Sequence, residues 1–279
     1  MPNIFMRFPD GKKKALTLSY DDGVEQDIRL IDIMKKNGLK GTFNINSGLY
    51  AKDEEQYSEK DVHKRLTRDA ALHLYKDSGM EVAVHGVTHL ILEQLPSNLC
   101  VEEIFEDRKN LERDYKKIVR GMAYPHGSYN DEVVNILKQC GIAYSRTVEV
   151  TGKFDIPTDW LRLPATCHHN DKQLMELAVS FVENKVSHAP QMFYLWGHSY
   201  EFDEYDNWYV IENFAKYIGC REDIWYATNI EIYDYIAAYK QLIFSTECVW
   251  IQNPTAIKLY FEVDGQIYSV NSGETLDLR

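Results

Sequence analysis

The sequence lacks the features that mark several large classes of protein. Its five cysteines are an odd number without a C-x-x-C pair, so they indicate neither a disulfide framework nor a thiolate zinc site. No stretch approaches the apolar length of a membrane span. The 31 basic residues are outnumbered by 43 acidic residues, and the resulting net charge of -12 repels phosphate backbones and anionic lipids. We therefore expect no membrane and no nucleic-acid partner.

The first residues, 1–14, also lack the apolar segment that follows a basic start in secretory signal peptides. We expect a cytoplasmic protein on this basis, or an exported one if a leader has been removed. The chain has 279 residues and is 44% apolar, which suffices for one large domain with a sizeable core.

Short apolar runs alternate with amphipathic stretches along most of the chain. The alternation predicts a mainly parallel α/β sheet, open or closed into a barrel. The expected strands are 15–20, 41–45, 80–85, 118–124, 142–148, 191–196 and 224–227. The expected helices are 27–36, 67–76, 101–117, 131–140, 172–184 and 229–241.

The pattern changes near the C-terminus. Two strand-like runs, 257–263 and 266–270, flank Asp264-Gly265, which is typical of a β-hairpin. We therefore predict a barrel domain over residues 1–244 and a small antiparallel β appendage over 245–279. We expect the appendage to cover an edge or end of the barrel, with carbohydrate binding as the alternative.

Polar residues gather where the predicted strands end. In a parallel α/β barrel these carboxyl ends form one mouth, so residues far apart in sequence become neighbours there. The residues at these positions are Asp21, Asp22, Asn44, Asn46, His85, Tyr124, Pro125, Arg146 and His198.

Two short patterns among these residues suggest a metal site. Asp21-Asp22-Gly23 ends one apolar run, and the pair His85 and His89 ends another. One carboxylate and two imidazoles suit Zn²⁺ or a similar ion, and the second carboxylate remains to take a proton from water. We expect the two histidines to face the same way on a helical turn. Each pattern alone also fits an ordinary turn or a solvated helix.

Three other histidines have no such context. We predict that His63, His73 and His188 are surface or helix-face residues.

The residues quoted above resemble the polysaccharide deacetylase family, also called the NodB-homology or carbohydrate esterase 4 group, over residues 15–241. The run Tyr20-Asp21-Asp22-Gly23 matches the first family motif, T/S-F/Y-D-D-G. The run His85-Gly86-Val87-Thr88-His89 approximates the second, H-S/T-x-x-H, with Gly86 in place of the hydroxyl residue. The resemblance implies an irregular (β/α)7 barrel, here with a small C-terminal β extension.

The resemblance also implies roles for individual residues. Asp21 would be the general base, and Asp22, His85 and His89 would hold one divalent metal ion. Zn²⁺ is the first choice, with Co²⁺, Ni²⁺ or Mn²⁺ as alternatives. His198, in Leu195-Trp196-Gly197-His198, resembles the late histidine that protonates the leaving group.

The third family motif, R-x-P-Y-G, is altered in this chain. It reads Ala123-Tyr124-Pro125-His126-Gly127 and so lacks the arginine that would steady the base. We hypothesise that Arg146, at the end of the next strand, supplies that guanidinium, and the alternative is a surface ion pair. A backbone N–H near His126 or Gly127 would hold the oxyanion.

The fourth motif is not clearly present. Asp159-Trp160-Leu161-Arg162 and Cys167-His168-His169-Asn170 lie in its region. Trp160, Trp196 and Tyr124 are candidates for flat walls against a sugar ring, although aromatic residues at strand ends usually belong to the core. His169 is a candidate for the mouth, and a solvated loop histidine is its alternative.

The function that we expect is metal-assisted removal of acetyl groups from an N- or O-acetylated oligo- or polysaccharide. One alternative is a hydrolase of a small cyclic amide or imide with the same barrel. A second is a non-catalytic carbohydrate-binding relative, and a third is an assembly protein that pairs through its hairpin. We make no prediction of the oligomeric state, the glycan or the leaving atom.

Overall fold

The computed structural model describes residues 3–53, 55, 57–58, 60–186 and 188–279. Its centre is a sheet in the order β7-β6-β5-β4-β3-β2-β9-β8, with β10 also paired to β2, and all of these pairs are parallel. The strands are β2 (Lys14–Asp21), β3 (Gly41–Ile45), β4 (Glu81–Val84), β5 (Gly121–Ala123), β6 (Tyr144–Val150), β7 (Leu163–Ala165), β8 (Cys167–His168), β9 (Gln191–Gly197) and β10 (Ile224–Tyr226).

One extended segment joins the two ends of this sheet. Strand β7 pairs with β6, strand β8 pairs with β9, and only Thr166 lies between β7 and β8. The sheet therefore curls on itself into an irregular barrel. The predicted class of fold, a parallel α/β barrel with a β extension, is confirmed.

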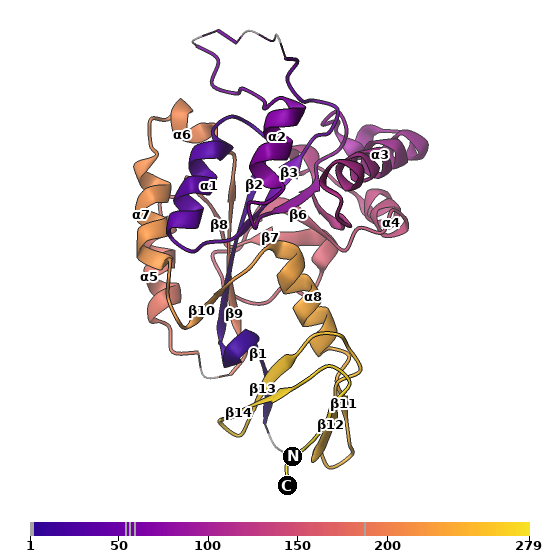
Figure 1. The fold of residues 1–279 in the computed structure, drawn as a ribbon, viewed down its shortest axis with the longest axis vertical. Coiled ribbons are helices and arrows are strands. Elements are labelled where there is room, and N and C mark those ends of the chain that lie inside the picture. The colour runs from indigo at the N-terminus through magenta and orange to yellow at the C-terminus, as the bar shows by residue number, and fades with distance from the viewer. Residues whose placement is uncertain (1–2, 54, 56, 59, 187) are drawn as a thin grey trace.

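Helices surround the sheet (Figure 1). They are α1 (Asp27–Lys36), α2 (Arg68–Tyr75), α3 (Ser97–Tyr115), α4 (Asp131–Gln139), α5 (Leu174–Glu183), α6 (Glu201–Glu204), α7 (Tyr209–Ile218) and α8 (Asn229–Tyr239). Local signals set several of their starts. The side chain of Asn130 accepts a hydrogen bond from the N–H of Val133 at the start of α4, and Thr228 with Glu231 forms a capping box on α8.

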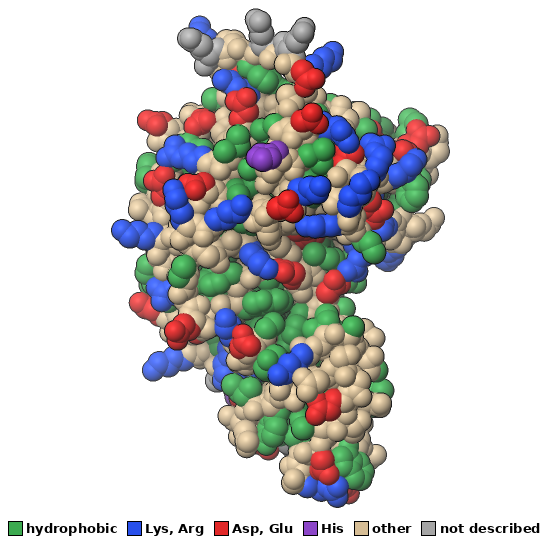
Figure 2. Space-filling view, in the orientation of Figure 1, with side chains coloured by type: hydrophobic (Ala, Val, Ile, Leu, Met, Phe, Trp, Pro, Cys, Tyr) green, Lys and Arg blue, Asp and Glu red, His purple; other side chains and the backbone are tan. Residues whose placement is uncertain are grey.

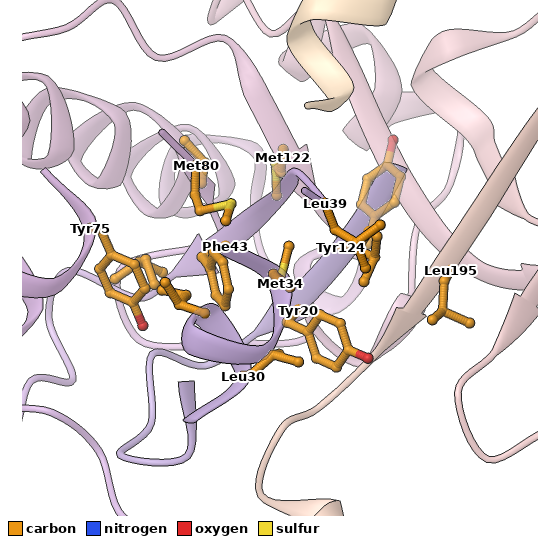
Figure 3. Packing of buried hydrophobic residues seen from close by; sticks show 14 of the residues in the cluster. Tyr20, Leu30, Met34, Leu39, Phe43, Tyr75, Met80, Met122, Tyr124 and Leu195 are labelled. Carbon is orange, nitrogen blue, oxygen red and sulfur yellow. The ribbon is translucent and has the colours of Figure 1, made fainter. Parts of the chain in front are cut away.

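Burial on both faces of the sheet explains why its strands read as apolar runs. Every residue of β2 and β3 is buried. Figure 3 shows Tyr20 and Phe43 from these strands beside Leu30 and Met34 of α1. Each large apolar side chain buried in this way contributes about 1.5–3 kcal/mol, so the strands that carry the site are firmly held.

A second core joins the barrel to the C-terminal appendage. It includes Tyr194 of β9, Ile236 of α8, and Leu259 and Phe261 of the predicted hairpin. The hairpin is present as β13 (Leu259–Val263) and β14 (Gln266–Val270).

The sequence reading missed two parts of this region. Strand β1 (Ile4–Arg7) pairs antiparallel with β13, so the start of the chain belongs to the appendage sheet. A separate small sheet contains β11 (Ile243–Phe244), β12 (Trp250–Gln252) and β15 (Thr275–Asp277). Figure 1 shows both chain ends at this pole of the molecule.

The surface carries charges of both signs. Figure 2 shows acidic and basic side chains interspersed over the barrel part of the face in view. None of the described helices is long and apolar enough to cross a membrane.

Candidate active site

The two neighbouring aspartates lie where β2 ends. Successive side chains of a strand point to opposite faces, so adjacent residues share one site only if the backbone changes direction between them. It does so here: Asp22 has φ 83° and Gly23 has φ 66°, both in the left-handed region. The N–H of Asp22 donates a hydrogen bond over 3.0 Å to the carbonyl of Asn44 on the neighbouring strand.

The two histidines lie on the loop after β4 and not on a helical turn, so our expectation of a helix was wrong. The loop bends because Gly86 has φ 76° and His89 has φ 58°. The Nδ1 atom of His85 lies 2.8 Å from the carbonyl oxygen of Ala123, which leaves Nε2 available. The two imidazole centroids are 4.7 Å apart.

Asp22, His85 and His89 form a group that fits a divalent ion. One ligand atom from each lies within 4.8 Å of the other two, close to the roughly 4 Å span of ligands that share an ion at about 2.1 Å. A metal-bound histidine usually donates its other N–H to a carbonyl or carboxylate, as His85 does to Ala123. Burial lowers the pKa of His85, and it lowers that of His89 to about 4, so both imidazoles are neutral, as metal binding requires.

Asp21 has a different set of partners. The guanidinium of Arg146 binds its Oδ2 atom, and the Asn44 amide donates to Oδ1 over 2.8 Å. Burial opposes the charge on Asp21, but Arg146, His85 and His198 outweigh it, so the pKa of Asp21 lies below its usual value. Asp21 is therefore an ionised carboxylate that stands beside the three-residue group.

Arg146 contacts Asp21, as the hypothesis requires, but it lies within β6 and not at the end of the strand. Its side chain is 1% exposed, so the alternative of a surface ion pair is wrong. The guanidinium also stacks over Trp196, 4.3 Å from the ring centroid. This cation–π contact fixes the plane of the group that Asp21 contacts.

His198 lies on the other side of Asp21. Its Nε2 atom is 3.7 Å from Asp21 Oδ2, and its Nδ1 atom is 2.9 Å from Glu201 Oε1. Burial disfavours the charged imidazole, but the hydrogen bond to Glu201 and the nearby Asp21 raise the pKa of His198 above its ordinary value. Sequence reasoning missed Glu201, although its position three residues after His198 was a usable signal.

His168, His198 and Glu201 also lie close enough to hold an ion. Their hydrogen bonds argue against it. His168 Nδ1 accepts from the Asn170 N–H over 3.2 Å, so in the neutral ring Nε2 carries the proton and faces Glu201, 3.4 Å away. We interpret this group as a hydrogen-bonded support for His198.

Two residues of the β3–α2 connection contact Asp22, and the sequence analysis missed both. Arg65 donates to the Asp22 carbonyl over 2.6 Å and to its Oδ1 atom over 3.2 Å. His63, predicted to be a surface residue, lies with Nε2 3.1 Å from Asp22 Oδ2. Burial opposes the charge on Asp22, yet His63, His85 and Arg65 hold its pKa below the usual range.

Arg65 also links Asp22 to the histidine loop. It donates to the side-chain oxygen of Asn46 over 2.9 Å, and the Asn46 amide donates to the carbonyls of His85 and Gly86. Two of the candidate ligands, Asp22 and His85, are thus connected through hydrogen bonds of the partly buried Arg65 and the buried Asn46.

The predicted substrate residues separate into two sets. The segment of Pro125, His126 and Gly127 forms a tight 3₁₀ turn next to His89, with the His89 and His126 rings 4.3 Å apart. The Gly127 N–H is bound by the Tyr124 carbonyl. The His126 N–H has no acceptor among the described residues and remains available.

Two of the remaining candidates, Tyr124 and His169, are buried. Tyr124 is 1% exposed, and its hydroxyl donates to the Leu161 carbonyl. Trp160 packs edge-on against Tyr233 of α8 in the second core. His169 is 0% exposed and stacks on Phe202. The predictions for Tyr124 and His169 failed because burial of a loop or strand-end residue depends on packing from distant segments, whereas Trp160 is half-buried.

The fold and the site together define a parallel α/β barrel that carries two carboxylates and a histidine pair at the carboxyl ends of neighbouring strands. Residues 9–145 match the model of the polysaccharide deacetylase family, and both recognised motifs fall within this range. This match confirms the predicted resemblance to the polysaccharide deacetylase family. A comparison with curated proteins found no match.

Solved structures include similar folds. A candidate polysaccharide deacetylase from Mycobacterium smegmatis is 16% identical, covers 84% of this chain and 93% of its own length, and has a TM-score of 0.58. The deacetylase PplD of Streptococcus pyogenes, in complex with acetate, is 24% identical over 52% of this chain and 61% of its own length, with a TM-score of 0.46. A family 4 carbohydrate esterase from Streptomyces lividans, in complex with acetate, is 16% identical over 76% of this chain and 91% of its own length, with a TM-score of 0.46.

Proposed function

We propose that this protein hydrolyses acetyl groups on an N- or O-acetylated carbohydrate, using one divalent metal ion. The observation that carries the proposal is the position of Asp21. Its Oδ2 atom lies 3.8 Å from His85 Nε2 and 3.7 Å from His198 Nε2. An ionised carboxylate thus stands between the candidate metal ligands and a histidine whose pKa is raised above its ordinary value, which is the arrangement that acid–base hydrolysis needs.

Asp22, His85 and His89 would hold the ion. Bound there, it would make water more acidic and polarise an acyl oxygen. Zn²⁺ suits two imidazoles and one carboxylate best, and Co²⁺, Ni²⁺ and Mn²⁺ are the alternatives.

The chain's own residues would perform the proton transfers. Asp21 takes a proton from the attacking water, because Arg146 and Asn44 hold it as an oriented anion. The free N–H of His126 donates to the oxygen on which negative charge develops. His198, held by Glu201 through Nδ1, delivers a proton from Nε2 to the departing amine or alcohol.

Release of acetate tests this proposal. Acetylated chito-oligosaccharides, acetylated xylan and a cyclic ureide would each be incubated with metal-loaded enzyme, and with enzyme treated with a chelator as the control. We expect acetate from a glycan substrate only with the loaded enzyme. Turnover of the ureide alone would favour the cyclic-amide alternative, and no turnover of any substrate would favour a binding protein.

A further inference from the structure

Helix α3 presents two carboxylates to the loop that carries the candidate histidine ligands. Glu103 and Asp107 are four residues apart, so they project from the same face of the helix. Glu103 is 9% exposed and Asp107 is 0% exposed. Neither takes part in the proton transfers proposed above.

Asp107 holds the start of the histidine loop. Its Oδ2 atom accepts from the N–H of His85 over 2.9 Å, and its Oδ1 atom accepts from the N–H of Ser47 over 2.7 Å. Both contacts are made with backbone donors. The carboxylate therefore ties the backbone of one candidate ligand to the end of β3.

Glu103 holds the other end of the loop. Its Oε2 atom accepts from the N–H of Thr88 over 2.9 Å, and its Oε1 atom accepts from the hydroxyl of Thr88 over 2.6 Å. Its own carbonyl accepts from the N–H of Val87 over 3.1 Å. Thr88 directly precedes His89, so this clamp fixes the backbone of the second candidate ligand.

The glycine in the second motif fits the same arrangement. A Cβ atom on Gly86 would lie 3.1 Å from Glu103 Oε2, and φ of 76° disfavours any other residue there. The carboxylate of Glu103 thus occupies the space beside the loop into which a side chain at position 86 would project.

We propose that Glu103 and Asp107 are positioning residues that fix the spacing of the His85 and His89 imidazoles and thereby set the affinity of the site for its metal ion. The inference rests on the metal site of the proposed function. Groups that orient metal ligands typically change metal affinity by about 10–100-fold when they are lost.

The two carboxylates differ in what can replace them. Glutamine at position 103 keeps one acceptor for the Thr88 N–H, and its amide can donate to the Thr88 hydroxyl, which then accepts. Asparagine at position 107 has only one acceptor for two backbone N–H donors, and its amide would face a donor. Glu103→Gln is therefore a conservative change, whereas Asp107→Asn is disruptive.

The test measures Zn²⁺ affinity by calorimetry on the full chain, together with the absorption spectrum of bound Co²⁺ and the melting temperature of the metal-free protein. The variants are Glu103→Ala, Glu103→Gln and Asp107→Asn, with Glu102→Ala, an exposed carboxylate on the same helix, as the control. We expect Glu103→Ala and Asp107→Asn to bind Zn²⁺ about 10–100-fold more weakly and to alter the Co²⁺ spectrum. Glu103→Gln and the control are expected to bind as the wild type does.

Wild-type affinity in Glu103→Ala and Asp107→Asn, with only their melting temperatures lowered, would overturn the inference while leaving the proposed function intact. Equal weakening by Glu103→Gln and Glu103→Ala would also overturn it, since hydrogen-bond geometry would then not be the cause. If Asp107→Asn does not fold, the two Glu103 variants decide. A wild-type protein that binds neither ion would refute the proposed function itself, and this inference with it.

Discussion

The guanidinium of Arg146, at the middle of β6, binds the carboxylate of Asp21, at the end of β2, although 125 residues separate them in the sequence. Both side chains are almost completely buried, at 1% and 3% exposed. The altered third motif of this chain has no arginine, and Arg146 of β6 contacts the residue that we propose as the base.

Arg146→Ala should damage both the fold and the base. Removal of one partner of a buried ion pair costs about 3–5 kcal/mol, so we expect a lower melting temperature. Burial raises the pKa of a carboxyl group, and without the counter-charge the pKa of Asp21 should rise. The acid limb of the kcat/KM profile should then move to higher pH. The variant Arg146→Lys keeps the charge but loses the planar stacking on Trp196. Its melting temperature and its acid limb should therefore lie between those of the wild type and those of Arg146→Ala. An acid limb unchanged in Arg146→Ala would count against the role.

Glu201→Gln should shift the alkaline limb of the kcat/KM profile to lower pH. The pKa of His198 is raised in the folded protein, so this group stays protonated to a higher pH than an ordinary histidine. Removal of the negative charge at Glu201 lowers that pKa, and the fall of kcat/KM on the alkaline side should begin at lower pH. Glu204→Gln, on the same short helix and exposed, is the matched control. Identical profiles for both variants would show that Glu201 does not tune the histidine.

Arg65→Ala should weaken metal binding without abolishing it. Arg65 orients Asp22 through both its carbonyl and its carboxylate, and it also contacts Asn46 beneath the histidine loop. Loss of such an orienting group is expected to cost about tenfold or more in metal affinity. Calorimetric titration with Zn²⁺ measures this, with Lys64→Ala as the control from the adjacent position. Equal affinities in the two variants would mean that Arg65 is not needed to position Asp22 for metal binding.

The sequence was sufficient for the parts of the site that follow strands. Asp21, Asp22, His85 and His198 each end or follow a β-strand, and Arg146 lies within one; the apolar runs of the sequence predict these strands. Because parallel strands share a carboxyl edge, their convergence could be inferred before any contact was known.

The residues that sequence reasoning missed come from other kinds of segment. Arg65 and His63 lie on a long connection without periodicity, so nothing local indicates which way they face. The burial of His169 could not be predicted, because the residues that stack on it, Tyr20 and Phe202, come from two distant segments of the sequence. Helix α7 is a different case: buried Ile211, Phe214, Ala215 and Ile218 have helical spacing, so the signal was present in the sequence.

Metal content and acetate release, measured on the same preparations of two variants, separate the proposed metal-binding role of Asp22 from the proposed catalytic role of Asp21. Asp22→Ala should lose bound metal and activity together. Asp21→Asn should keep the metal at the wild-type ratio and lose turnover, because the amide preserves the shape but removes the basic oxygen. Full metal occupancy in Asp22→Ala, or wild-type acetate release by Asp21→Asn, would contradict the account.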